Sequence, residues 1–193
     1  MIKLSLSELL KQNTKSNHQQ LEKLLVTKLR LISTTEDYIK LLQLFYGYFG
    51  GLEDKIIGNL SEVHMDDHLE RRKTLSIAND IKILGGTLNE KAKEGDLPQI
   101  ENFLQALGAL YVIEGSTLGG RVIVKMLQRQ LDIEHNKGLS FFSGYGEETE
   151  SMWTSFKELL NNQTLTLGET ELIIAAADST FEKFKLWIEK NDL

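Results

Sequence analysis

The chain has 193 residues, enough to bury one sizeable core, and its length fits one domain over 1–193. It has no cysteine, which excludes disulfides, zinc–thiolate sites, iron–sulfur clusters and cysteine nucleophiles. Its net charge of -6 argues against nucleic acid as a partner, because binding to phosphate requires a basic surface. It shows neither a signal peptide nor a run of about 18 apolar residues, so we expect a soluble, cytoplasmic protein without a membrane partner.

Helical periodicity dominates the sequence, and no segment alternates convincingly between apolar and polar residues. Pro98 is the only proline, which leaves room for long helices because proline interrupts them. In chain order we expect helices at about 4–25 with a break near 13–14, at 35–58, at 68–84 ending before Gly85 and Gly86, at 99–131, at 147–162 and at 168–191, with connections at 87–98 and 136–146. These elements predict an all-α bundle of about six or seven helices.

The segment 107–128, LGALYVIEGSTLGGRVIVKMLQ, is apolar and helical in period, yet three glycines lie in its middle. Each interior glycine costs a helix roughly 1 kcal/mol relative to alanine. Such glycines are typical of a kink or of a place where another group approaches the backbone closely. Gly115 and Gly119 share one face, so a flat, bulky ligand could lie against this helix; packing against another helix is the alternative.

A second candidate feature lies in the amphipathic segment 13–25. His18 and Glu22 are four residues apart and therefore neighbours on one helical face. The carboxylate could orient the imidazole and raise its basicity, as carboxylates do beside metal-bound histidines. Lys11, two turns before His18, could pair with an anionic group at the edge of a ligand. Taken alone, a single histidine is more often a surface or core residue than a ligand.

Together these segments resemble the heme oxygenase family, specifically its bacterial branch. The resemblance rests on H-x-x-x-E at 18–22, on the glycine-rich segment 110–122, and on FFSGYG at 141–146, which is typical of the bacterial branch that includes enzymes partnered with bacteriophytochromes. It covers nearly the whole chain, and the order of elements agrees. It implies the all-α fold of that family and the cleavage of heme, with O2 and a reductant, to biliverdin, carbon monoxide and ferrous iron.

The resemblance also implies how the chain holds its ligand. His18 would bind the heme iron from the proximal side, and Glu22 would hydrogen-bond toward its imidazole. Lys11 and Tyr111 match positions that reach the heme propionates. Two aromatic residues of the last helix would pack on the macrocycle, although ordinary core positions are equally compatible with the sequence: Phe181 and Phe184.

On the distal side, the resemblance places the glycines Gly115, Gly119 and Gly120 over the face of the heme. Ser116 would lie close to bound oxygen. Many mammalian-type members have an aspartate at this position, where it anchors a water network, whereas other bacterial members also have serine. The expected catalytic residues are therefore these three glycines and the serine, with heme as both cofactor and substrate.

Alternative functions remain open at this point. A heme carrier on the same fold would keep His18 but would not turn over its ligand. A di-iron oxidase would require Glu-x-x-His pairs, which the sequence lacks. His64 and His68 could bind a divalent metal, but a solvated first turn of a helix explains them more simply. The family implies a ferredoxin or a flavoprotein reductase as the electron donor. A monomer is the default expectation, and the reaction could either supply a bacteriophytochrome with biliverdin or release iron.

Overall fold

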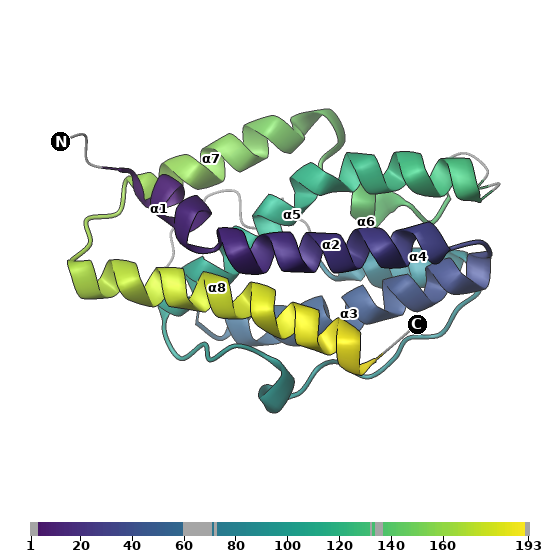
Figure 1. Cartoon of the computed structure of the whole chain (residues 1–193), viewed down its shortest axis with the longest axis horizontal. Helices are drawn as coiled ribbons and strands as arrows, with labels where there is room; N and C mark the ends of the chain where they lie inside the picture. The colour runs from purple at the N-terminus through teal and green to yellow at the C-terminus, as the bar shows by residue number, and fades with distance from the viewer. Residues whose placement is uncertain (1–3, 60–70, 72, 132, 134–136, 192–193) are drawn as a thin grey trace.

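The computed structural model describes residues 4–59, 71, 73–131, 133 and 137–191, and these residues form a bundle of helices without a strand (Figure 1). The all-α prediction is therefore confirmed. In chain order the elements are α1 (Leu6–Asn13), α2 (Lys15–Leu31), α3 (Thr35–Ile57), α4 (Leu75–Ile83), η1 (Glu94–Asp96), α5 (Phe103–Gln130), α6 (Ser140–Ser143), η3 (Gly146–Glu148), α7 (Thr149–Asn161) and α8 (Leu167–Lys190).

The centre of the bundle is α5, the longest of the described helices. It packs against α3, α6, α7 and α8, and α2 lies along both α8 and α5. Within the described part of the chain, α5 is the one helix that is long and apolar enough to cross a membrane by length and composition. Because four helices cover it, we interpret this apolar character as that of a core helix.

The break predicted near 13–14 is confirmed, and it divides the first segment into α1 and α2. Thr14 lies between the two helices with φ -93° and ψ 0°, and its buried hydroxyl donates to the Leu10 carbonyl at 2.8 Å. The predicted end at residue 25 is wrong, because α2 continues to Leu31 and buries Leu29 in the core. The chain leaves the helix at Ile32, where the backbone becomes extended.

The predicted helix at 68–84 begins later than expected. Its described part, α4, starts at Leu75, and Arg71 before it is not helical. The predicted end is confirmed, since Gly85 follows α4 with φ +86°, a conformation that favours glycine. The candidate histidines His64 and His68 lie outside the described residues.

The prediction of a loop over 136–146 is wrong in part, because α6 forms one helical turn there. Phe141 and Phe142 of this turn are buried, and both rings contact Phe45 of α3. The turn is held from α4 by Asp80, which accepts hydrogen bonds from the Ser140 hydroxyl at 2.7 Å and from the Phe141 amide at 2.8 Å. Tertiary contacts therefore create a helix that is too short to show periodicity.

We expect Asp80→Ala to lower the free energy of unfolding by about 1–3 kcal/mol, because the buried Phe141 amide then loses its acceptor. Urea denaturation monitored by circular dichroism measures this change. Asp54→Ala is the control, since the exposed pair between Asp54 and Lys91 contributes at most about 1 kcal/mol. Equal losses in both variants would contradict a role for Asp80 in holding α6.

Candidate functional site

The predicted iron ligand, His18, lies on α2 with an exposed side chain. Its ring faces Phe181 of α8, with ring centroids 5.2 Å apart. Hydrogen bonds from Asn17 to Asp178, at 2.9 Å, and from Lys185 to Gln20, also at 2.9 Å, hold α2 beside α8. Within the described residues the imidazole makes no side-chain hydrogen bond, so both ring nitrogens are available to a ligand.

The other residues predicted near His18 are placed less simply. Glu22 is exposed one turn further along α2, and no hydrogen bond to the imidazole is present among the described residues. Lys11 is exposed on α1, on the other side of the Thr14 break. The break at Thr14 therefore interrupts the two helical turns that separate Lys11 from His18. A role for Lys11 at the edge of a ligand stays a prediction.

The three glycines of the α5 segment lie in three different environments. A Cβ atom at Gly120 would collide with the Phe142 carbonyl oxygen, so this glycine lets α6 approach the backbone of α5. A Cβ atom at Gly115 would lie in ordinary contact with Trp153, at 3.6 Å. A Cβ atom at Gly119 would have nothing within 4 Å. The packing alternative thus accounts for Gly120, while Gly119 faces open space.

The open face around Gly119 is apolar. Leu118 is 38% exposed and Val122 is 62% exposed, although both belong to the central helix of the bundle. Helical geometry places them on the same side as Gly115 and Gly119. An unfilled apolar surface with no side chain at its middle fits a flat aromatic ligand, and the exposed imidazole of His18 fits a metal at the centre of such a ligand. The residues present therefore fit heme.

The aromatic residues predicted at the site differ in burial. Tyr111 is half-buried beside Trp153, with ring centroids 5.5 Å apart, and this burial raises the pKa of its hydroxyl above the ordinary value. It is therefore a neutral hydrogen-bond donor at physiological pH. Phe184 is enclosed in the core, where its ring stacks on Tyr48 at 4.6 Å. Phe181 is also buried, and its ring contacts the His18 ring.

Two hydroxyls bond to the backbone of α5 beside Gly115. The Ser116 hydroxyl donates to the Ile113 carbonyl, and the Thr117 hydroxyl donates to the Glu114 carbonyl, each at 2.7 Å. Such bonds to a carbonyl one turn earlier bend a helix. The hydroxyl of the predicted catalytic serine is therefore bonded to the helix backbone beside the glycine face.

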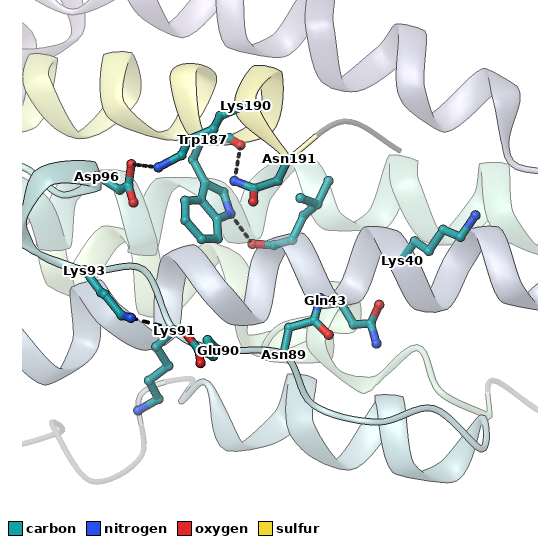
Figure 2. A pocket seen from close by; sticks show the side chains of 11 residues that line it. Lys40, Gln43, Asn89, Glu90, Lys91, Lys93, Asp96, Trp187, Lys190 and Asn191 are labelled. Atoms are coloured by element: carbon teal, nitrogen blue, oxygen red, sulfur yellow. Dashed lines mark hydrogen bonds and ion pairs between the residues drawn. The ribbon is translucent and has the colours of Figure 1, made fainter.

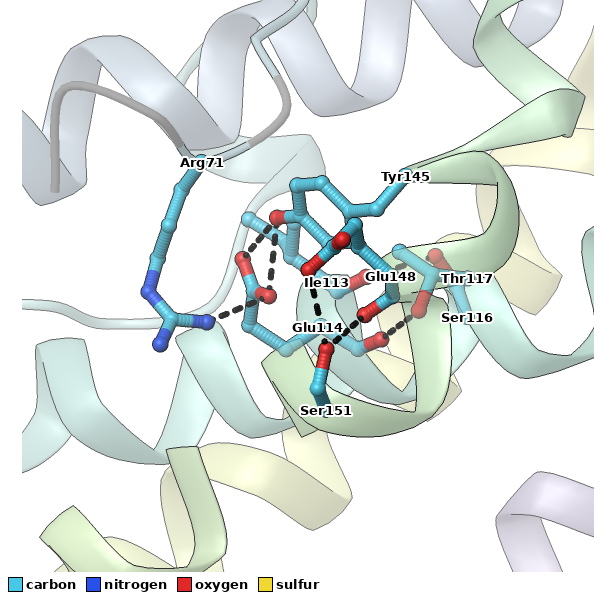
Figure 3. Close-up of polar contacts among 8 residues, drawn as sticks. All are labelled: Arg71, Ile113, Glu114, Ser116, Thr117, Tyr145, Glu148 and Ser151. Atoms are coloured by element: carbon cyan, nitrogen blue, oxygen red, sulfur yellow. Dashed lines mark hydrogen bonds and ion pairs between the residues drawn. The ribbon is translucent and has the colours of Figure 1, made fainter. Parts of the chain in front are cut away.

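A buried polar cluster that sequence reasoning missed lies next to these glycines (Figure 3). Arg71 donates to the Glu114 carboxylate at 2.7 Å, and the Tyr145 hydroxyl donates to the same carboxylate at 2.9 Å. The side chains of Arg71 and Glu114 are only 4% and 2% exposed. The sequence held one signal of this cluster, since Glu114 is the only acidic residue in the apolar segment 107–128.

A hollow of about 730 Å³ lies elsewhere, between α3, the connection 87–98 and α8 (Figure 2). Its wall includes Trp187, whose indole donates to the Leu44 carbonyl at 3.0 Å, and an ion pair between Lys190 and Asp96 at 2.8 Å. None of the residues predicted to bind or act on a ligand lines it. We therefore place the candidate site between α2 and α5 and assign no ligand to this hollow.

Comparison with known proteins agrees with this geometry. The chain is similar to the heme oxygenase of Xanthomonas campestris pv. campestris (strain 8004), with 27% identity over 150 residues, which cover 77% of this chain and 87% of that protein. Its fold matches crystal structures of the NO- and CO-bound heme oxygenase from Neisseria meningitidis, with a TM-score of 0.82 and 24% identity, over 98% of this chain and 92% of that one.

Two further solved structures share the fold at lower identity. Heme oxygenase from Leptospira interrogans matches with a TM-score of 0.74 and 17% identity, over 97% of this chain and 100% of that one. Heme oxygenase-1 from Synechocystis sp. PCC6803, solved in complex with heme, matches with a TM-score of 0.74 and 14% identity, over 97% and 92%. The sequence profile of the family described as heme oxygenase matches residues 4–190. The chain therefore belongs to the heme oxygenase family.

Proposed function

We propose that this member of the heme oxygenase family opens heme to biliverdin, carbon monoxide and ferrous iron between α2 and α5. The family makes the chain an enzyme that degrades heme. The observation that carries the finer proposal is the pairing of an exposed imidazole, on a helix that contacts α5, with the unfilled apolar face around Gly119. Bound heme supplies the iron that activates oxygen and is itself the molecule oxidised.

Each side of the site would contribute differently. His18 would hold the iron through a ring nitrogen, since a neutral imidazole is a good ligand for it. Gly115 and Gly119 would let the ring lie against the α5 backbone, and Ser116 would lie near the oxygen-binding side. Tyr111, with its raised pKa, would donate to a propionate as a neutral hydroxyl.

The finer features that the family suggests complete the proposal. The chain would act as one cytoplasmic domain over 1–193 and as a monomer. Electrons would come from a ferredoxin or a flavoprotein reductase, and O2 is the second substrate. A bacteriophytochrome is the expected recipient of the biliverdin.

Hemin titration of the wild-type protein and of His18→Ala tests the proposal. We expect a sharp Soret band in the wild type, and in the variant a shifted or weakened band with affinity lower by at least about tenfold, or about 1.4 kcal/mol. Gln19→Ala, at the neighbouring exposed position of α2, should bind hemin as the wild type does.

Ascorbate or a ferredoxin system in air then tests the reaction. Growth of biliverdin absorbance in the wild type would support the enzyme. Binding without turnover would favour the heme carrier, and the absence of saturable binding would overturn both.

A further inference from the structure

The turn that carries the FFSGYG motif contacts α5 on both sides of its glycine segment. Before the segment, the Tyr145 hydroxyl donates to the Glu114 carboxylate, at 2.9 Å to Oε2 and 3.2 Å to Oε1. After it, Arg121 Nη2 donates to the Gly146 carbonyl at 2.7 Å. Between these two bonds, the Phe142 carbonyl lies directly against Gly120. The turn therefore holds the glycine segment at three successive points.

The Glu114 carboxylate, which Tyr145 contacts, is also bound by a residue from another part of the chain. Arg71, which precedes α4, donates to Glu114 Oε2 at 2.7 Å (Figure 3). The Arg71 guanidinium also lies over the Phe156 ring of α7, with Cζ 5.2 Å from the ring centroid. The carboxylate of Glu114 is thus fixed by two donors that come from separate parts of the chain.

The backbone of the turn determines where Tyr145 points. Gly144 and Gly146, on either side of it, have φ values of +58° and +59°, a conformation that favours glycine. The Thr149 hydroxyl donates to the Gly146 carbonyl at 2.8 Å, which ties the turn to the start of α7. The sequence Gly-Tyr-Gly, which alone indicates only a turn, therefore directs a tyrosine to a buried carboxylate.

The contacts divide the circumference of α5 between two faces. Helical geometry points the residues that meet the turn and those of the open face, on average, toward opposite sides of the helix. The residues toward the turn are Glu114, Thr117, Gly120 and Arg121, and those on the open face are Leu118, Gly119 and Val122, with Gly115 on the same side but next to Trp153. The contacts of the turn with Glu114, Gly120 and Arg121 would therefore act on a ligand at the open face through the path of the α5 backbone.

We propose that residues 141–146 form a clamp that sets the path of the α5 backbone across the heme and so determines which edge of the ring is presented for oxidation. Tyr145 of the clamp and Arg121 of α5 are positioning residues: Tyr145 acts through Glu114, and Arg121 holds the clamp through the Gly146 carbonyl. The inference rests on the proposed function, because it names what controls the position of the ligand in that site. Precise placement of reacting groups has large effects on reaction outcome.

Amide hydrogen exchange of the protein without ligand tests the clamp directly. In Tyr145→Phe, which removes one hydroxyl, we expect amides of 115–122 to exchange about fivefold faster relative to those of α3, as for the loss of one hydrogen bond. Tyr48→Phe is the control, since it removes another buried hydroxyl bond, to the Thr180 carbonyl at 2.7 Å. Because Tyr48 belongs to α3, this variant should not raise exchange at 115–122 above that of α3.

Arg121→Met removes the second bond and should have the same local effect. Lys125→Met is its control, because it removes a positive charge from the next turn of the same helix, where the side chain is exposed. If neither Tyr145→Phe nor Arg121→Met changes exchange at 115–122 more than at α3, the clamp is refuted.

The composition of the biliverdin isomers, separated by chromatography, tests the effect on the ligand. We expect the share of minor isomers to rise at least about twofold in Tyr145→Phe and Arg121→Met but not in the two controls. An unchanged isomer ratio, with altered exchange, would overturn the control of heme orientation. If the wild type produces no biliverdin, the proposed function fails, while hydrogen exchange still decides whether the clamp exists.

Discussion

Glu114→Ala is expected to lower the free energy of unfolding by about 3–5 kcal/mol, a large effect for a single substitution. The reason is that the Arg71 guanidinium stays buried after the substitution but loses the carboxylate 2.7 Å away. The Tyr145 hydroxyl loses its acceptor at the same time. Urea denaturation at a fixed pH, with the wild type measured in parallel, gives the change.

The comparison with a double variant separates the lost charge from the lost packing. Arg71→Met combined with Glu114→Leu removes both charges, and we expect it to recover most of the stability, because apolar residues of similar volume replace a buried ion pair at little cost. Glu90→Ala is the exposed control, since Glu90 and Lys93 are 87% and 82% exposed, and it should lose at most about 1 kcal/mol. A loss from Glu114→Ala no greater than that of the control would contradict this prediction.

Gly119→Ala and Gly120→Ala are expected to act in opposite directions on stability. At Gly119 the new methyl group meets open space, so the variant should gain about 0.5–1 kcal/mol from the higher helix propensity of alanine. At Gly120 the methyl group collides with the Phe142 backbone, so the variant should lose about 1–3 kcal/mol as α6 is displaced. Thermal and urea unfolding without ligand measure both changes.

We expect the order of hemin affinity in these two variants to be the reverse of their order of stability. The methyl group of Gly119→Ala lies where the proposed function places the ring, so we expect weaker binding and slower turnover from the more stable protein. Wild-type hemin affinity and turnover in Gly119→Ala would remove Gly119 from the site. A Gly120→Ala protein as stable as the wild type would show that α6 moves away without a penalty.

The sequence predicts those helices whose stability depends on a long apolar stripe. The 35–58 periodicity corresponds closely to α3, and the break near Thr14 was visible because polar residues interrupt the pattern there. Helix α6 could not be predicted in this way, since it has only four residues. It forms because Asp80, sixty positions earlier in the chain, accepts hydrogen bonds from its first amides.

The sequence indicates those parts of the candidate site whose residue types are unusual in their own segment. It does not indicate those that depend on a residue far away in the sequence. His18 and the glycine face could be identified because a histidine one turn from a carboxylate and glycines inside a helix are unusual. The sequence could not distinguish Gly119 from Gly120, because only the folded chain brings the Phe142 carbonyl to one of them. Glu114 was missed because Arg71 is 43 residues away in sequence.

The division of α5 into two faces has a consequence for how this segment tolerates change over generations. On the proposed function, we expect substitutions toward the clamp, at Thr117 or Gly120, to reduce the amount of folded protein, and substitutions on the open face, at Gly119 or Val122, to leave abundance intact and reduce turnover. In a library of single variants scored separately for abundance and for activity, the two kinds of loss would alternate with the period of the helix. Selection for folded protein and selection for turnover would therefore act on alternating positions of one short segment.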